Sequence, residues 1–220
     1  MEFSEASSTL TRANQVYQQV RWKLLAGGFL PGERLTVRQV AQGLNVSFTP
    51  AREGLLRLST EGALILGPRF FSVPLLSSSS TDEIYRARRL LEVDLALAAL
   101  PRLTPESIGH LQSIQDAMVE ALSTRRYSEA LVRNYLFHFG LYSAAQMPII
   151  LHVVEELWVR CGPSLNYMYP KLVVEPGHVH GHIPILNALR ERDPQMLQQA
   201  LERDLGNGQR SIKSSLENGS

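Results

Sequence analysis

Residues 33–65 read ERLTVRQVAQGLNVSFTPAREGLLRLSTEGALI, and this stretch decides the fold. Its first part has apolar residues at the spacing of one helix face, which predicts a short helix over residues 37–44. The inward positions of this helix are Val37, Val40, Ala41 and Leu44. Asn45 tolerates the left-handed backbone conformation that ends many helices, so we expect the chain to turn there.

The second part of the stretch predicts another helix directly after this turn. Ser47 or Thr49 can cap it, and Pro50 falls in its first turn, where a missing N–H costs nothing. Leucines at helical spacing supply its buried side as far as Glu61, and Gly62 ends it. These leucines are Leu55, Leu56 and Leu58. Two helices joined by a tight turn are typical of a helix-turn-helix.

The flanking residues extend this motif on both sides. Val16, Val20 and Leu24 predict a preceding helix over residues 14–26. Two short apolar runs follow, at residues 63–66 and 70–73, and the turn-forming Gly67-Pro68-Arg69 between them predicts a β-hairpin. Together these elements predict a winged helix-turn-helix over residues 11–75. Residues 1–10 are expected to be a disordered lead-in, and the polar residues 76–81 a linker.

The rest of the chain, residues 82–216, is predicted to be an all-helical antiparallel bundle. Helical patterns occupy residues 82–100, 105–122, 127–145, 148–160, 182–192 and 194–216. Bundles of this kind build ligand sites between facing helices. The predicted fold class is therefore mainly α, with a small β-hairpin wing on the first domain.

Charge is distributed unevenly between the two halves. Residues 10–75 hold eight Lys and Arg against three acids, a net charge of +5, whereas residues 76–220 hold 14 against 16, a net charge of −2. A basic module joined to a mildly acidic one indicates that the first module meets a polyanion, although charge alone does not exclude chance clustering. The single cysteine, Cys161, fits a reducing compartment. With neither a signal peptide nor an apolar run of membrane-spanning length, we expect a cytoplasmic protein without a membrane partner.

The quoted stretch resembles the DNA-binding domain of the GntR family of bacterial regulators. Val46-Ser47-Phe48-Thr49-Pro50-Ala51-Arg52-Glu53 is similar to the turn and helix start of that family. The resemblance implies DNA contacts from Arg38, Ser47, Phe48, Thr49 and Arg52, and from Arg69 at the hairpin tip. Arg52 is placed to contact guanine O6 and N7 in the major groove. The alternative for Arg52 is an ion pair with Glu53 or Glu61.

Two residues depart from the family pattern. Many relatives carry arginine at the position of Phe48 and glycine at the position of Arg69. A phenylalanine can lie against a thymine methyl or a sugar, but it cannot read guanine. These departures bear on the operator sequence rather than on DNA binding itself.

Residues 82–205 resemble the FadR-type C-terminal domain, called FCD, which binds effectors in one GntR subfamily. Three motifs carry the resemblance: Tyr85-x-x-Arg88-x-x-x-Glu92, Asn134-x-x-Phe137-His138, and the helix that starts at His182. The resemblance implies a divalent metal, Zn²⁺, Mn²⁺ or Ni²⁺, bound by Asn134, His138 and His182, with Asp204 where relatives have a third histidine. Taken alone, His138 reads as a buried histidine with ordinary partners.

Arginines of the second domain are candidates for binding an anionic effector. Arg88 and Arg160 can each hold a carboxylate through two parallel hydrogen bonds, and Tyr135 is a candidate lining residue. The alternative for Arg88 is an ion pair with Glu92 four residues later. Aromatic residues at helical spacing usually belong to the core.

The resemblance implies a homodimer that reads a palindromic operator in double-stranded DNA and responds to a small organic acid, usually as a repressor. Two alternatives stay open from the residues alone. One is a metal-dependent enzyme that uses the histidine cluster. The other is a DNA-binding adaptor whose helical domain only dimerises or docks another protein.

Overall fold

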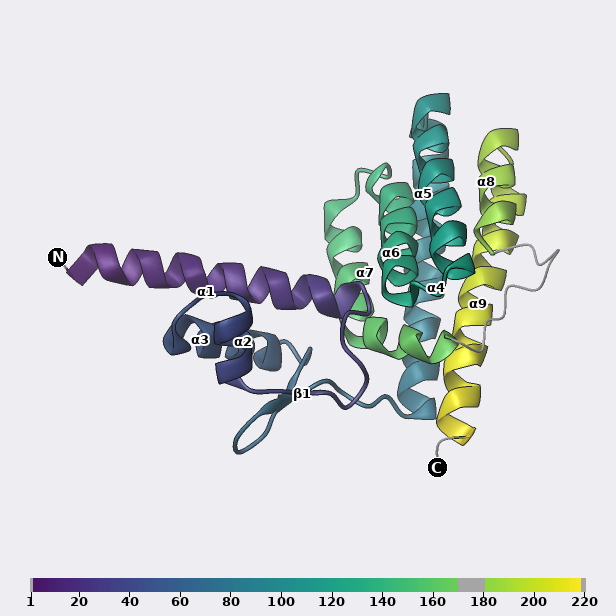
Figure 1. Cartoon of the computed structure of the whole chain (residues 1–220). Helices are drawn as coiled ribbons and strands as arrows, with labels where there is room; N and C mark the ends of the chain where they lie inside the picture. Colours follow the sequence, from purple (N-terminus) through teal and green to yellow (C-terminus); the bar gives the residue numbers. More distant parts are fainter. Residues whose placement is uncertain (1, 170–180, 219–220) are drawn as a thin grey trace.

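The computed structural model describes the backbone of residues 2–169 and 181–218 (Figure 1). The first domain contains α1 (Glu2–Leu25), β1 (Arg34–Leu35), α2 (Val37–Gly43), α3 (Phe48–Thr60), β2 (Ile65–Leu66) and β3 (Phe71–Ser72). The second contains α4 (Ser78–Ala99), the 3₁₀ turn η1 (Leu100–Arg102), α5 (Pro105–Ser123), α6 (Tyr127–Ser143), α7 (Pro148–Cys161), η2 (Gly162–Met168), α8 (His182–Glu191) and α9 (Pro194–Asn218). The predicted mainly α fold class is confirmed.

The helix-turn-helix forms where its sequence signals lie. Thr36 and Gln39 make a reciprocal capping box at the start of α2. Asn45 turns the chain with a φ of 51°. Ser47 is the N-cap residue of α3, and Pro50 is buried in the first turn. The sequence prediction of a tight turn followed by a proline-started helix is confirmed.

Helix α1 crosses α3 closely because α3 carries a glycine at the contact. A Cβ built on Gly54 would lie 2.8 Å from Val16 Cγ1 and 3.0 Å from the carbonyl oxygen of Ala13. The first distance is shorter than real Cβ contacts, and the second is tighter than most of them, so a side chain at position 54 would force the two helices to shift.

The wing is a three-stranded antiparallel sheet in the order β1-β3-β2. Ser72 pairs with both Arg34 and Ile65, and Phe71 pairs with both Leu35 and Leu66. The predicted hairpin is therefore present, with shorter strands than expected. Strand β1 was not predicted, because two residues are too short to show the alternation by which a strand is recognised.

Two predicted segments differ from the structure. Helix α1 begins at Glu2, so residues 2–10 continue the helix instead of forming a disordered lead-in; this segment contains neither glycine nor proline to stop a helix. The predicted linker 76–81 is shorter than expected, because Ser77 caps α4 by accepting a hydrogen bond from the N–H of Ser80. The serine run reads as polar linker, but serine is also a strong helix N-cap.

The second domain packs its helices side by side, with α8 and α9 along one edge of the bundle (Figure 1). Arg192 adopts a left-handed conformation, φ 57°, and so reverses the chain between these two helices. In the described part of the chain, no helix combines the length and the apolar character needed to cross a membrane.

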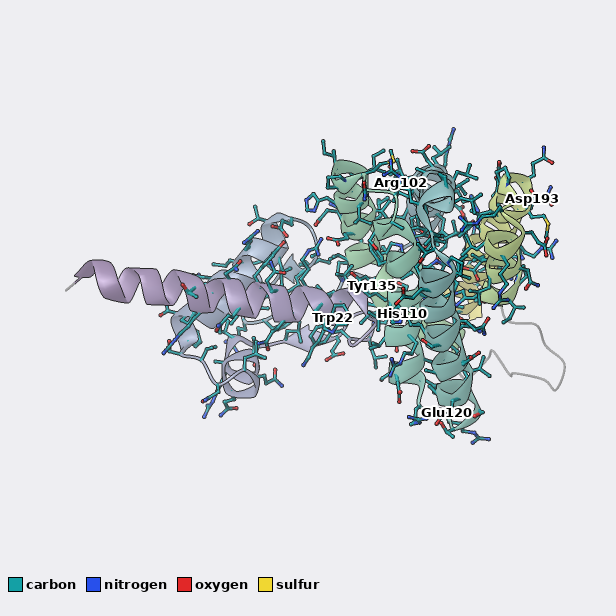
Figure 2. All side chains as sticks on the ribbon, turned by 90° about the horizontal axis from the view of Figure 1, so that it is seen from above. Trp22, Arg102, His110, Glu120, Tyr135 and Asp193 are labelled. Carbon is teal, nitrogen blue, oxygen red and sulfur yellow. The ribbon has the colours of Figure 1, made fainter. Side chains whose placement is uncertain are left out.

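The two domains meet where the C-terminal half of α1 lies against α7 and η2. Arg21 donates from Nη1 to Glu155 Oε2 at 3.2 Å and from Nη2 to Glu156 Oε1 at 2.6 Å. Trp22 packs edge-on against Tyr135, with ring centroids 5.0 Å apart (Figure 2). Asn166 of η2 donates to the carbonyl oxygens of Gly27 and Phe29. These contacts hold the first domain against α7 and η2, and both of these elements also line a cavity in the second domain.

Candidate metal site and DNA-binding surface

A cavity of about 70 Å³ lies inside the helical bundle. Its walls come from α4, α5, α6, α7, η2 and α9, and they include Arg88, Asn134, His138, Trp158 and Asp204. Three of the four predicted metal ligands therefore line one cavity. The fourth, His182, is buried and stacks on Phe137 at a centroid distance of 3.9 Å.

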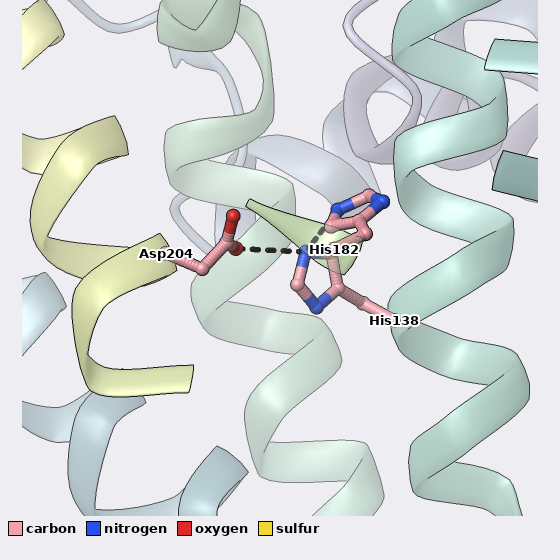
Figure 3. Close-up of side chains that lie close together, drawn as sticks. All are labelled: His138, His182 and Asp204. Carbon is pink, nitrogen blue, oxygen red and sulfur yellow. Dashed lines mark hydrogen bonds and ion pairs between the residues drawn. The ribbon is translucent and has the colours of Figure 1, made fainter. Parts of the chain in front are cut away.

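Two histidines and one carboxylate converge at the cavity wall (Figure 3). His138 Nε2 lies 3.2 Å from His182 Nε2 and 3.3 Å from Asp204 Oδ2. One ligand atom from each of the three residues falls within 4.8 Å of the others. His138, His182 and Asp204 come from α6, α8 and α9, so only the packing of three helices brings them together.

Hydrogen bonds at the opposite ring nitrogens determine where the imidazole protons lie. His182 Nδ1 is 2.6 Å from Gln115 Oε1, an oxygen that can only accept, so Nδ1 carries the proton. His138 Nδ1 is 3.0 Å from the Tyr142 hydroxyl. That hydroxyl donates its one proton to Glu92 Oε2 at 2.7 Å, so it accepts from His138 Nδ1–H.

With the protons on Nδ1, each imidazole in its neutral form directs an Nε2 lone pair at the same point, next to the carboxylate of Asp204. Three electron-rich atoms at such distances repel one another unless a proton or a metal cation lies between them. Two imidazoles and a carboxylate suit Zn²⁺, Mn²⁺ or Ni²⁺, and a partner that fixes the Nδ1 proton is the usual outer support of a histidine ligand. The donor set fits a divalent metal.

Asn134 and Gly181 border this group. Asn134 precedes His138 by one helical turn and lines the same cavity. Gly181 lies against Asp204 so closely that a Cβ would collide with the carboxylate. The glycine before α8 thus leaves the space that the Asp204 side chain occupies.

Glu92 is the buried anion behind the histidines. It accepts from Arg88 Nε at 2.6 Å, from Trp158 Nε1 at 2.8 Å and from the Tyr142 hydroxyl. Burial and the nearby charge of Glu92 hold the pKa of Tyr142 well above its usual range, so the hydroxyl stays protonated. The alternative expected for Arg88, an ion pair with Glu92, is thus present, and Arg88 lines the cavity as well.

Burial lowers the pKa of the Arg88 guanidinium, but Glu92 together with the nearby Cys161 and Tyr85 outweighs that effect and keeps this pKa well above its usual value. Arg88 therefore remains a fixed positive charge at the cavity wall.

Two predicted ligand-binding residues lie away from this cavity. Tyr135 packs between Trp22 and Phe139, and burial followed by the charge of Glu155 raises its pKa to about 12. Arg160 donates to the carbonyl oxygen of Glu61, at the contact between the two domains. Neither residue lines this cavity, because helical spacing does not reveal which neighbour a side chain faces, and their role as effector contacts stays a prediction.

The structure leaves every predicted DNA-contacting residue of the first domain open to solvent. Arg38, Ser47, Phe48, Thr49, Arg52 and Arg69 are all exposed. On α3, Pro50, Ala51 and Leu55 are buried, whereas the side of the helix that carries Thr49, Arg52 and Glu53 faces solvent. This is the geometry by which a recognition helix enters the major groove.

Arg52 is available for such a contact. The alternative partner Glu61 is taken by Arg57 Nε at 3.2 Å and by the Tyr17 hydroxyl at 2.8 Å. Within the described residues Arg52 makes no ion pair. Ser47 likewise makes no side-chain capping bond, so its hydroxyl is accessible to a phosphate.

Gln115 is the site residue that sequence reasoning missed. It lies 67 positions before His182, so no local pattern joins the two. Tyr142 did carry a signal, because it follows His138 by four residues and so shares its helix face.

Family models match both domains of the chain. The model described as bacterial regulatory proteins, gntR family, matches residues 12–69, and the FCD domain model matches residues 83–207. The HTH-type transcriptional regulator McbR of Escherichia coli K12 is 34% identical over 184 residues, covering 81% of this chain and 82% of McbR. The Nta operon transcriptional regulator of Aminobacter aminovorans is 31% identical, covering 75% of this chain and 78% of that protein.

Solved structures agree with this assignment. The structure titled E. coli McbR/YncC superposes with a TM-score of 0.83 at 30% identity, over 95% of this chain and 99% of that one. A GntR regulator from Rhodococcus sp. RHA1 shares the fold, with a TM-score of 0.74 at 19% identity over 93% and 98% of the two chains. The chain therefore belongs to the GntR family of bacterial regulatory proteins, in the FadR-type subfamily with an FCD domain, and it is a DNA-binding transcription regulator rather than an enzyme.

Proposed function

We propose that this regulator is a cytoplasmic homodimeric repressor whose affinity for a palindromic operator is set by a small organic acid bound at a divalent metal. Asn134, His138, His182 and Asp204 would hold the metal. The observation that carries the proposal is the convergence of two Nε2 lone pairs and a carboxylate in one cavity. When bound, the metal would supply a positive charge with open coordination positions for an acid.

The charges around the cavity favour an acid as the effector. Arg88 contributes +1, while Glu92 and Asp204 contribute −1 each, so these groups sum to −1 without a metal. A divalent cation changes the sum to +1, which favours an anionic ligand. The cavity of about 70 Å³ has room for roughly five waters, or for an acid of a few heavy atoms that displaces them.

Helix α7 and η2 offer a route from the cavity to the DNA-binding domain. On α7, Trp158 lines the cavity while Glu155 and Glu156 hold Arg21 of α1. On η2, Leu165 lines the cavity, and its neighbour Asn166 donates to the carbonyl oxygens of Gly27 and Phe29, directly after α1. A ligand that favours one position of α7 and η2 would therefore bias the position of the recognition helices.

A direct test of the metal site is the metal content of untagged protein. We expect near-stoichiometric metal in the wild type and loss of it in His182→Ala. His110→Ala is the matched control, because His110 is an exposed histidine on the neighbouring helix α5 and should leave the metal in place (Figure 2). A wild-type protein that neither contains metal nor binds added Zn²⁺ or Mn²⁺ would refute the site.

The effector is tested by operator binding in the presence of small mono-, di- and hydroxycarboxylic acids. We expect at least one acid to change operator affinity about 5- to 150-fold, the range of ordinary allosteric coupling. That change should disappear in His182→Ala but persist in His110→Ala. If no acid shifts either operator affinity or melting temperature, the helical domain serves dimerisation or protein docking instead.

The DNA surface is tested with Arg52→Ala on an operator selected from random duplexes. Loss of a two-bond guanine contact costs about 1–3 kcal/mol of specific binding. Arg86→Ala is the control, since Arg86 is an exposed arginine on α4 of the other domain. Sedimentation of the complex should show two chains per duplex, and a single chain would contradict the homodimer.

A further inference from the structure

Phe48 is an anomaly on the DNA-binding surface. It is the first residue of α3, and its side chain is 58% exposed. It does not belong to the hydrophobic core of the domain. A single exposed apolar residue is ordinary in a protein, so its exposure alone carries no conclusion. Its position beside three exposed polar residues, Ser47, Thr49 and Arg52, is what calls for an explanation.

Phe48 and Arg52 lie on the same side of the helix. Four residues separate them, so they differ by about 40° in direction and about 6 Å along the axis. Pro50 and Gly54, which lie about 120–160° around the helix from these two residues, are buried against the core. A groove that Arg52 enters therefore also receives the phenyl ring. Stacked base pairs rise about 3.4 Å, so the two side chains reach bases no more than about two pairs apart.

A phenyl ring offers no hydrogen bond to a base edge. Of the groups that base pairs present in the major groove, only the C5 methyl of thymine is apolar. Any other base at that place would leave polar edges desolvated against the ring, and this costs free energy without a compensating hydrogen bond.

We propose that Phe48 is a specificity-determining residue that makes operator binding depend on a thymine methyl, within two base pairs of the guanine contacted by Arg52. The inference rests on the assignment of α3 as the recognition helix. It adds a base identity, and a chemical group of that base, to the proposed Arg52 contact. Cytosine methylated at C5 presents the same methyl group at the same edge, so the contact should accept it as well.

The test begins with selection of binding sites from random duplexes by the full-length protein. We expect enriched half-sites to contain a guanine and, within two base pairs, a thymine. Uracil is then placed at that thymine, which removes only the methyl group. Wild-type affinity should fall about fourfold, since that is what burial of one methyl-sized group is worth. At the same position, 5-methylcytosine should bind better than cytosine.

Phe48→Ala should bind the thymine and uracil duplexes equally, because the partner of the methyl group is gone. Since Phe48 lies outside the core, its melting temperature should match that of the wild type. Phe48→Leu is a second variant that keeps an apolar contact and so keeps a preference for thymine over uracil. Phe48→Arg should move the preference at that position from thymine to guanine.

Failure of the inference can be told apart from failure of the recognition-helix assignment. If Arg52→Ala weakens operator binding but uracil substitution has no effect at any position near the guanine, Phe48 does not read a methyl group. The same conclusion follows if Phe48→Ala keeps the full uracil effect. If Arg52→Ala leaves operator affinity unchanged, the assignment of α3 itself is wrong.

Discussion

Glu92→Gln should weaken metal binding without changing a metal ligand. In the wild type, Glu92 Oε1 accepts from Arg88 and Trp158, and Oε2 accepts from the Tyr142 hydroxyl. A glutamine whose oxygen keeps the first two bonds presents its NH₂ group to Tyr142. The tyrosine must then accept, and its proton turns toward His138 Nδ1. The proton of His138 moves to Nε2, the atom that would bind the metal.

The expected magnitudes come from the same contacts. Mutation of a residue that orients a histidine ligand lowers metal affinity about 10- to 100-fold. Stability falls as well, because Arg88 is buried and loses its counter-charge. Breaking a buried pair costs about 3–5 kcal/mol, and glutamine keeps the hydrogen bonds from Arg88 and Trp158, so we expect a loss of about 3 kcal/mol. For a chain of this size, that lowers Tm by about 6–12 °C.

Calorimetric titration with Zn²⁺ and thermal unfolding measure the two effects separately. Tyr142→Phe is the matched variant, because it removes the bridge to His138 but leaves the Arg88–Glu92 pair intact. It should weaken Zn²⁺ binding similarly and lower stability by only about 1–2 kcal/mol. Wild-type Zn²⁺ affinity in Glu92→Gln would refute the proton arrangement, and an unchanged Tm would refute the buried ion pair.

Three further predictions address packing, pH and coupling. Gly54→Ala should destabilise the first domain by about 1–2 kcal/mol in urea unfolding, because its Cβ would overlap Val16. Gly109→Ala is the control, because a Cβ at position 109 has nothing within 4 Å. It should leave the free energy of unfolding unchanged or raise it by up to about 1 kcal/mol. The pKa of Tyr135 is about 12 in the folded protein and 10.0 in the unfolded chain, so the stability that its protonated form contributes is complete below pH 10 and is lost as pH rises toward 12. Tyr135→Phe should therefore lose less free energy of unfolding over this pH range. An identical pH profile for the two proteins would contradict the raised pKa. Arg21→Met removes both ion pairs from α1 to the glutamates of α7. Operator affinities measured with and without metal should then differ less than in the wild type, while metal affinity itself stays the same. An undiminished difference would exclude coupling through Arg21.

The sequence by itself determined the DNA-binding domain, because its signals are local. A capping threonine, a left-handed asparagine and a proline in the first helical turn lie within 15 residues and act on the backbone of their own segment. The helices of the second domain were recognised for the same reason, since 3.6-residue periodicity is a property of each segment. Strand β1 was not predicted from local signals, because it forms only through pairing with β3.

The metal site was only partly determined by sequence. Asn134 and His138 share a helix, but no pattern within one segment reports that α8 and α9 bring His182 and Asp204 to them. The resemblance to a family supplied that link. It did not supply Gln115, which orients His182 from a helix 67 positions away.

Tertiary structure alone decided what each buried polar side chain faces. Arg88 turned toward both Glu92 and the cavity, whereas Tyr135 and Arg160 turned toward the first domain. All three have the same helical setting in sequence. The physical reason is that helical periodicity gives the direction of a side chain relative to its own axis, while its partners depend on the crossing of helices that are far apart in the chain.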